Sequence, residues 1–319
     1  MSKTTFTAAN PSAKDIHATV TNSLIAAIEA NPGDWTMPWR RSGQSLRLPL
    51  NAASKRAYRG INTVVLWVTA QEASYASRHW ATYKQWSELG AQVKKGEKGT
   101  PVVFYKTFHA NPDPDDPEDD GTRRTARSFT VFNASQVEGF DDPDATSEDT
   151  LPADAPQRIE AAERFIAATG ADIRYGGDRA FYRPSTDHIQ MPFLSSFTGT
   201  DTMTADEAFA ATKLHELLHW SGAPHRLNRE FGKRFGDEAY AFEELVAEIG
   251  ACILMAELSI APNIRPDHAQ YLAHWLGILK QDKRAIFTAA ARAQEAVEFL
   301  RTLQTEPALT GEEPLAVAA

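Results

Sequence analysis

Hydrophobic positions recur every three to four residues in several long stretches of the chain, which indicates helices with one buried face. In the first half this pattern predicts helices at 15–30, about 62–72 and 82–90. In the second half it predicts helices at 157–169, 204–220, about 238–258, 267–281 and 283–303. Thr82 with Gln85, and Thr204 with Glu207, have the spacing of capping boxes, so they mark two of the helix starts.

Shorter apolar runs between these helices predict strands. The runs lie at 101–105, 128–132, 171–175, 179–183 and 188–191. The stretch from 111 to 121 is rich in Pro and Asp and too charged to pack, so we expect a solvated loop there. Helices and short strands in this order indicate an α+β protein.

The domain organisation follows from length and local composition. A chain of 319 residues is long enough for two domains, each with its own core. Residues 141–156 are acidic, contain Pro and have few apolar side chains, which is typical of a linker. We therefore expect an α+β domain at 1–140, a mainly helical domain with a small sheet at 157–303, and a disordered tail at 304–319.

Composition narrows the class of protein. The 42% hydrophobic and 24% charged residues are typical of a folded globular chain. No apolar run is long enough to cross a bilayer and the first residues are polar, so we expect a cytoplasmic protein with no membrane partner. Cys252 is the only cysteine, so a metal site must use His and carboxylate ligands.

The net charge of −9 is unevenly distributed along the chain. Residues 1–100 carry a net charge of +7, residues 101–157 carry −9, and the remainder carries −7. A basic block before acidic ones is typical of a nucleic-acid-binding domain joined to another domain.

The segment His215-Glu216-Leu217-Leu218-His219 is the motif of zinc-dependent peptidases. Residues four apart share a helix face, so His215 and His219 can bind one ion. Glu216 is then the candidate general base, since its carboxylate can deprotonate a zinc-bound water. We expect one Zn²⁺ per chain, with another divalent transition metal as the alternative; chance occurrence of two His on an amphipathic helix is the competing reading.

Two residues compete to be the third ligand. His225 fits the longer spacing of metzincins, but the Met of their characteristic turn has no counterpart, because Met255 lies in an apolar helical stretch. Glu244 completes the His₂Glu set of a catalytic zinc site, and we favour it. Glu248, one turn later, is a candidate acceptor for a ligand His, whereas Glu243 is expected to face solvent.

Two further features near this motif have both a functional and a structural interpretation. The hydroxyl of Tyr240 is a candidate donor to an oxyanion, although packing is the simpler role. Residues 188–192 are either an edge strand on which an extended peptide pairs or an ordinary strand of the sheet.

Aromatic and basic residues alternate between Trp35 and Lys98. Aromatic faces stack on unpaired bases, and Lys and Arg neutralise phosphates, so the mixture favours binding of single-stranded nucleic acid. Each aromatic side chain on its own is better explained by packing in the core. The candidates from this region are Trp39, Arg40, Tyr58, Arg59, Trp80, Tyr83, Lys84, Lys94, Lys95 and Lys98.

Dispersed segments in both halves of the chain match one known family. In the first half they are Trp35 to Trp39 with Asn51, and the segments 58–62, 80–85 and 93–99. In the second half they are Ala180-Phe181-Tyr182 with Asp187, Met191-Pro192, and the segments 215–220 and 243–248. In these residues the whole chain resembles the ArdC-type antirestriction proteins of plasmids. The resemblance implies a single-stranded-DNA-binding domain followed by a zincin-like peptidase domain. It adds Asn62 to the candidate DNA-binding residues, supports a Glu ligand from 243–248 and gives His225 no role.

Three functions are compatible with these features. The first is an antirestriction factor that binds single-stranded DNA and protects an incoming plasmid from host restriction, as the resemblance implies. The second is a zinc peptidase that cleaves a host protein, with DNA binding serving only for delivery. The third is a DNA mimic, in which the acidic segments titrate a restriction enzyme.

Overall fold

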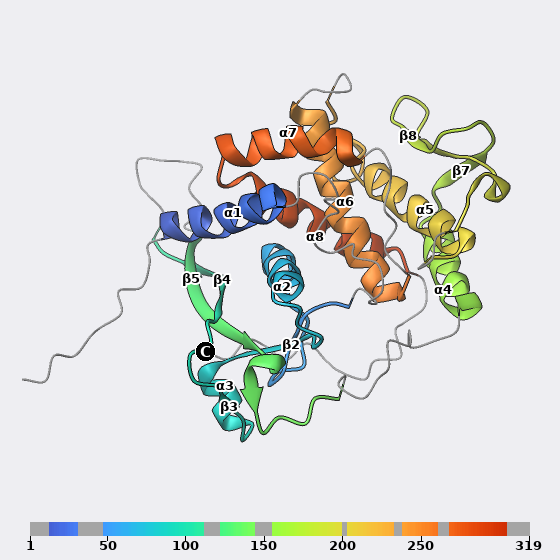
Figure 1. Cartoon of the computed structure of the whole chain (residues 1–319). Helices are drawn as coiled ribbons and strands as arrows, with labels where there is room; N and C mark the ends of the chain where they lie inside the picture. Colours follow the sequence, from blue (N-terminus) through green and yellow to red (C-terminus); the bar gives the residue numbers. More distant parts are fainter. Residues whose placement is uncertain are drawn as a thin grey trace, which may run out of the picture.

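The structure is a computed structural model that describes residues 13–30, 47–111, 122–143, 155–199, 203–232, 238–260 and 268–304 (Figure 1). Most of the predicted linker at 141–156, the acidic stretch at 112–121 and nearly all of the predicted tail lie outside the described residues. Helices and several small sheets make up the described part, which confirms the α+β class.

The first half contains a four-stranded sheet in the order β1 (Leu50–Asn51), β2 (His79–Thr82), β5 (Thr122–Asn133) and β4 (Thr100–His109). Strands β1 and β2 are parallel, and the other neighbours are antiparallel. Strands β3 (Gln92–Val93) and β6 (Val137–Glu138) form a separate two-stranded antiparallel sheet. Helix α3 (Tyr83–Glu88) packs against β2 and begins at the capping box of Thr82 and Gln85.

Helix α2 (Ile61–Glu72) is fixed to the sheet by Asn62. The Nδ2 group of Asn62 donates to the Val103 carbonyl, and its Oδ1 accepts from the Val103 amide, both at 2.8 Å. One buried side chain therefore satisfies both backbone groups of a residue on β4, where no further strand could do so.

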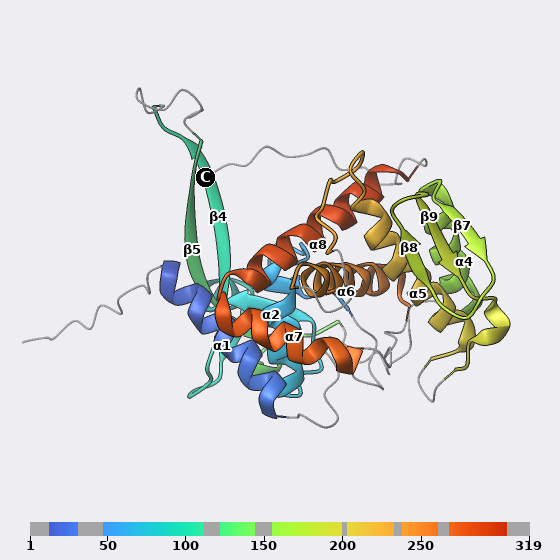
Figure 2. The same cartoon turned by 90° about the horizontal axis from the view of Figure 1, so that it is seen from above.

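Strands β4 and β5 are longer than the apolar runs predicted. They pair in one antiparallel register from Thr100 opposite Val131 to His109 opposite Thr122. Figure 2 shows the two strands leaving the body of the molecule as a narrow ribbon. The sequence of its outer part has no alternating apolar pattern, so the predicted strands end short of it.

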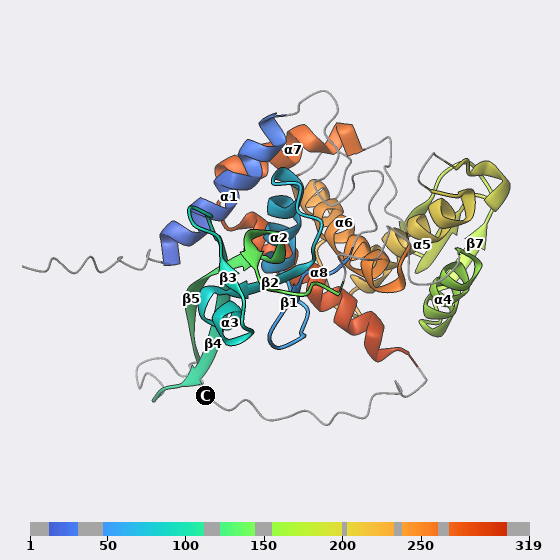
Figure 3. The same cartoon turned by 60° about the horizontal axis from the view of Figure 1, so that its bottom comes forward.

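The second half begins with α4 (Ala155–Ala168) and a three-stranded sheet in the order β7 (Asp172–Tyr175), β9 (His188–Met191) and β8 (Phe181–Arg183). Helix α5 (Ala205–Ser221) packs against β8 and β9. Helices α6 (Glu238–Leu258), α7 (His268–Gln281) and α8 (Ala285–Thr302) follow. Figure 3 shows α4 and β7 at the opposite end of the molecule from α3 and β3.

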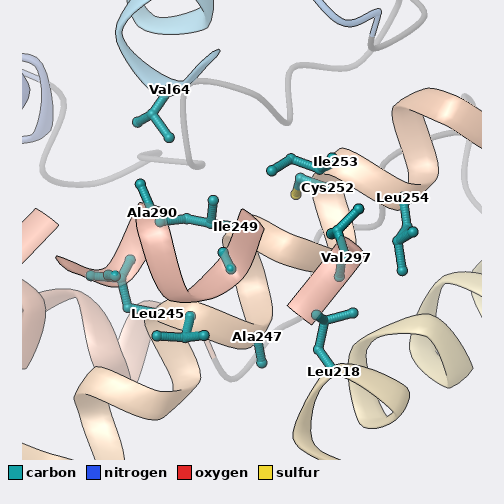
Figure 4. Close-up of a cluster of buried hydrophobic side chains, with 14 of the residues drawn as sticks. Val64, Leu218, Leu245, Ala247, Ile249, Cys252, Ile253, Leu254, Ala290 and Val297 are labelled. Atoms are coloured by element: carbon teal, nitrogen blue, oxygen red, sulfur yellow. The ribbon is translucent and has the colours of Figure 1, made fainter. Parts of the chain in front are cut away.

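The expectation of two separate cores is only partly met. Two small clusters belong to the first half, one around Trp86 and one around Trp80. The largest cluster, however, joins Val20 of α1 (Ala13–Ala30) and Val64 of α2 to the buried faces of α5, α6 and α8. Figure 4 shows Val64 directed toward Ala290 and Ile249. Helices α1 and α2 bury their apolar faces on α7 and α8, so both halves share the main core.

No described helix has both the length and the apolar character needed to cross a membrane.

Candidate metal centre and nucleic-acid interface

Helix α5 carries the metal-binding motif and is anchored at its start. Thr204 accepts a hydrogen bond from the amide of Glu207, and Glu207 accepts one from the amide of Thr204. Arg158 adds a buried ion pair to Glu207 at 2.8 Å. Burial tends to raise the pKa of Glu207, but the hydrogen bonds from Thr204 and Arg158 outweigh it and lower that pKa. The start of the helix is therefore fixed by a charged cap.

His215 and His219 lie one turn apart on the buried face of α5, and Glu244 reaches them from α6. The two Nε2 atoms are 3.2 Å apart, and the Glu244 oxygens lie 3.5 Å from His215 Nε2 and 3.4 Å from His219 Nε2. One ligand atom from each residue falls within a group spanning at most 4.8 Å. The structure thus brings together the three predicted ligands.

These distances fit a small divalent ion. Ligand atoms about 2.1 Å from a tetrahedral zinc ion are roughly 3.4 Å from one another. The two Nε2 atoms are separated by 3.2 Å, close to that value, and each imidazole has one oxygen of Glu244 at a similar distance, Oε2 at 3.5 Å for His215 and Oε1 at 3.4 Å for His219. Two imidazoles and one carboxylate are also the donor set of catalytic zinc sites. The residues present therefore fit the metal that the motif predicts.

The electrostatics of this group also favour a cation. Burial by itself lowers the pKa of His219, but the carboxylates of Glu244 and Glu243 outweigh burial and raise the pKa to about 10. Burial raises the pKa of Glu244, but the adjacent His219 and His215 overcome it and hold that pKa far below the usual range. Several carboxylates thus face the two imidazoles in a buried setting, where a positive charge is strongly stabilised.

His225 lies outside this group. Its side chain is 63% exposed and its Nε2 is 3.2 Å from Asp187. The adjacent Arg226 stacks on the ring of Trp220 at 3.8 Å and donates to Asp187, which draws this segment toward the loop before β9. His225 and Arg226 therefore contact the loop before β9, and His225 does not join the group of metal ligands.

The expectation that Glu243 faces solvent is wrong. Its exposed fraction is 4%, and its Oε1 lies 3.2 Å from Nδ1 of His219. Arg229 holds the same carboxylate from the other side. Glu248 is the acceptor expected from the sequence, but its Oε2 lies 3.8 Å from Nδ1 of His215, beyond hydrogen-bond range. No sequence signal indicated Arg229, because it belongs to an irregular segment after α5.

Glu216 and Tyr240 lie on the two helices that form the site. Glu216 is buried on α5 between the two ligand histidines. Tyr240 is half-buried in the first turns of α6 and packs against the main core. Their chemical roles stay predictions.

The segment 188–192 is not an edge strand. Strand β9 is the centre of its sheet, paired in parallel with β7 and antiparallel with β8. Its backbone groups are used on both sides, so an added peptide strand has no place to pair. The prediction of peptide pairing on this segment is therefore wrong, and the ordinary structural reading holds.

The predicted DNA-binding residues divide into buried and exposed groups. Trp80 is 1% exposed, and Tyr58 and Asn62 are also buried. Their side chains pack in or beside the first-half sheet and α2, which agrees with the packing interpretation, and their contact with DNA stays a prediction. Trp39 and Arg40 lie outside the described residues. The exposed residues are Arg59, Tyr83, Lys84, Lys94, Lys95 and Lys98.

Arg59 and the lysines differ in their surroundings. Arg59 forms an ion pair with Glu298 of α8, and the amide of Gly60 donates to Gln294 on the same helix. The predicted DNA-binding segment at 58–62 is thus partly a contact between the two halves. By contrast, Tyr83 is 53% exposed and borders a cavity of about 600 Å³ that Lys94 and Lys95 also line.

Comparison with known proteins covers both halves of the chain. Residues 14–132 match the family described as the N-terminal domain of anti-restriction factor ArdC, and residues 160–292 match a zincin-like metallopeptidase family. The crystal structure of antirestriction ArdC protein from the R388 plasmid is 40% identical, with a TM-score of 0.71, and covers 91% of this chain and 98% of its own. That protein has been solved metal-free and with Mn(II) bound.

Three curated relatives also align along most of the chain. Uncharacterized protein y4eC of Sinorhizobium fredii (strain NBRC 101917 / NGR234) is 45% identical over 92% of this chain and 93% of its own length. Two proteins of Escherichia coli described as DNA primase TraC are 38% and 37% identical over 90% of this chain. This chain spans only 27% and 20% of their lengths.

Proposed function

The chain belongs to the ArdC family of antirestriction proteins, and on that basis we propose that it binds single-stranded DNA and protects incoming plasmid DNA from host restriction. In this proposal residues 1–140 bind DNA, 141–156 are a linker and 157–303 are the zincin-like part. The protein acts in the cytoplasm, where an entering single strand becomes accessible.

One observation supports the DNA-binding surface above all. Tyr83 is more than half exposed and lines a cavity together with Gln92, Val93, Lys94, Lys95, Glu97, Phe132 and Glu138. Its hydroxyl accepts a hydrogen bond from Gln92 at 2.7 Å, which orients the ring. Lys94 donates one hydrogen bond to the Ser135 carbonyl at 3.0 Å and keeps further donors for a phosphate. An oriented ring beside ammonium groups suits unpaired bases and their backbone.

Fluorescence anisotropy with a labelled oligothymidine tests this surface in the full chain. Tyr83→Ala is expected to weaken binding about 5- to 150-fold, because one base–aromatic stack contributes roughly 1–3 kcal/mol. The double variant Lys94→Ala with Lys95→Ala should make the slope of log binding constant against log salt concentration less steep by about 1.4. The control is Arg164→Ala with Arg174→Ala, which removes two exposed charges of the second half.

Two results bear on this proposal in opposite directions. Preference for single strands over duplex, with losses confined to the Tyr83 and lysine variants, supports it. No binding of any single strand at low salt would sink it. Protection is measured separately, as survival of plasmid transfer into a restricting recipient.

A zinc peptidase that cleaves a host protein is the second candidate, and the site formed by His215, His219 and Glu244 favours it. Zn²⁺ bound there would supply a Lewis acid and lower the pKa of a bound water. Glu216, which is buried on α5, is the proposed general base. Glu216→Gln removes the base and keeps the ligands. If protection survives this change, proteolysis is not the operative mechanism; if protection is lost while DNA binding is kept, the peptidase function is favoured.

A further inference from the structure

Glu243 contacts the Nδ1 atom of the His219 ring, on the side of the ring that faces away from the other ligands. This Nδ1 lies 3.2 Å from Glu243 Oε1, while the Nε2 of His219 faces His215 and Glu244. Arg229 grips the same carboxylate with two hydrogen bonds, Nε to Oε2 at 3.0 Å and Nη2 to Oε1 at 2.8 Å. A two-point contact between guanidinium and carboxylate fixes both position and plane of the acceptor.

Arg229 is itself fixed to the end of α5. Its Nη2 donates to the Leu218 carbonyl and its Nη1 to Ser221 Oγ at 3.0 Å. Its amide donates to the Gly222 carbonyl at 2.8 Å. These contacts satisfy carbonyl groups at a helix C-terminus, where positive charge is also favourable. The guanidinium and the Glu243 carboxylate are only 4% and 5% exposed, so little water competes for them.

A ligand histidine must offer a lone pair to the metal, and its second nitrogen then carries the proton. Glu243 is a carboxylate and can only accept at Nδ1, so it selects the form of His219 in which Nε2 is the ligand. Without an acceptor there, the ring could rotate or use the other nitrogen.

We propose that Glu243 and Arg229 are positioning residues for the metal ligand His219, and that they set the affinity of the chain for a divalent transition metal. Glu243 orients the imidazole, and Arg229 holds the Glu243 carboxylate in place. The proposal rests on the metal site of the second half and not on DNA binding, so the two can fail separately.

The competing explanation is that this buried pair only joins α5 to α6. The chain contains a matched control, because Glu207 of α5 forms a similarly buried pair with Arg158 at 2.8 Å and touches none of the ligands. Glu243→Gln and Glu207→Gln each remove one buried charge from a Glu–Arg pair. A merely structural role predicts similar losses of stability and unchanged metal affinity in both.

The experiment measures Zn²⁺ and Mn²⁺ dissociation constants of the full chain by competition with a chromophoric chelator. Glu243→Gln is expected to weaken both about 10- to 100-fold, the range typical of such outer partners, with Glu207→Gln close to wild type. The visible spectrum of the Co²⁺ form should change in Glu243→Gln and not in Glu207→Gln. Wild-type affinity and an unchanged Co²⁺ spectrum in a folded Glu243→Gln variant would overturn the proposal.

A measurement on the unaltered chain covers the case in which Glu243→Gln does not fold. Long-range ¹H–¹⁵N NMR of the Zn²⁺-loaded protein reports which nitrogen of each histidine binds the ion. The proposal expects a proton on Nδ1 of His219 and the metal on Nε2. Metal on Nδ1, or no binding of either ion by the wild-type chain, would refute it.

Discussion

Gly250 of α6 faces Leu218, the residue just before the ligand His219 on α5. A Cβ atom built on Gly250 would lie 2.5 Å from Leu218 Cδ1 and 2.9 Å from its Cγ. Favourable carbon contacts lie at about 3.5–4.0 Å, so Gly250→Ala requires a shift of roughly 1 Å. Leu218 is fully buried and the Ala293 carbonyl lies 3.6 Å from the same point, so the space for this shift is small.

The expected magnitude combines two opposing effects. Adding a methyl group to a packed core costs about 1–3 kcal/mol. Replacing Gly by Ala within a helix contributes about 1 kcal/mol of stability. Gly250→Ala should therefore lower the free energy of unfolding by about 0–2 kcal/mol. It should also weaken Zn²⁺ binding, because separating α5 from α6 moves His219 away from Glu244.

Gly277 of α7 provides the matched control, since a Cβ built there has no heavy atom within 4 Å. Gly277→Ala should stabilise the chain by about 1 kcal/mol through helix propensity alone. Urea denaturation of both variants, followed by far-UV circular dichroism, gives the comparison. Equal stabilisation by the two substitutions would refute the claim that Gly250 is required for close packing of α5 on α6.

Three further predictions concern other residues of the structure. Asn62→Ala leaves the two buried backbone groups of Val103 without partners and should cost about 2–4 kcal/mol in urea denaturation, whereas a loss below about 1 kcal/mol would show that water replaces the amide. Glu207 has a lowered pKa in the folded chain, so its contribution to stability is present above its ordinary pKa and is lost as the pH falls through the folded value. Glu207→Gln should therefore reduce the loss of unfolding free energy over this acid range. An unchanged pH dependence of the unfolding free energy in the variant would contradict the assignment. Zn²⁺ at 100 times its dissociation constant should raise the free energy of unfolding by about 2.7 kcal/mol, and chelation or His219→Ala should abolish the gain, as calorimetry would show.

The sequence predicted those features that depend on neighbours in the chain. The capping boxes at Thr82 and Thr204 use residues three apart, and both are present. The two histidines of α5 lie one turn apart in the sequence itself. Glu244 needed a second helix, and the donor set of zinc sites supplied the reason to choose it.

Features that depend on tertiary contacts were missed or misread. The guanidinium of Arg229 meets Glu243 only because an irregular segment folds back on α5, and no local pattern encodes that return. Trp80 and Tyr83 are three residues apart with similar aromatic character, yet one lies in the core and the other at the surface. Trp80 belongs to strand β2, whereas Tyr83 is the first residue of helix α3, and alternating aromatic and basic residues cannot reveal this difference.

The core shared by α1, α2 and the helices of the second half bears on how such a protein can be divided. Cutting between residues 141 and 156 would expose the apolar faces around Val20 and Val64 on one fragment and those around Ala290 and Val297 on the other. Both fragments would tend to aggregate. The alignments with the two much longer TraC proteins include 90% of this chain, and so both halves together. This agreement over both halves is consistent with the common interior, because one half without the other would leave that interior open to water.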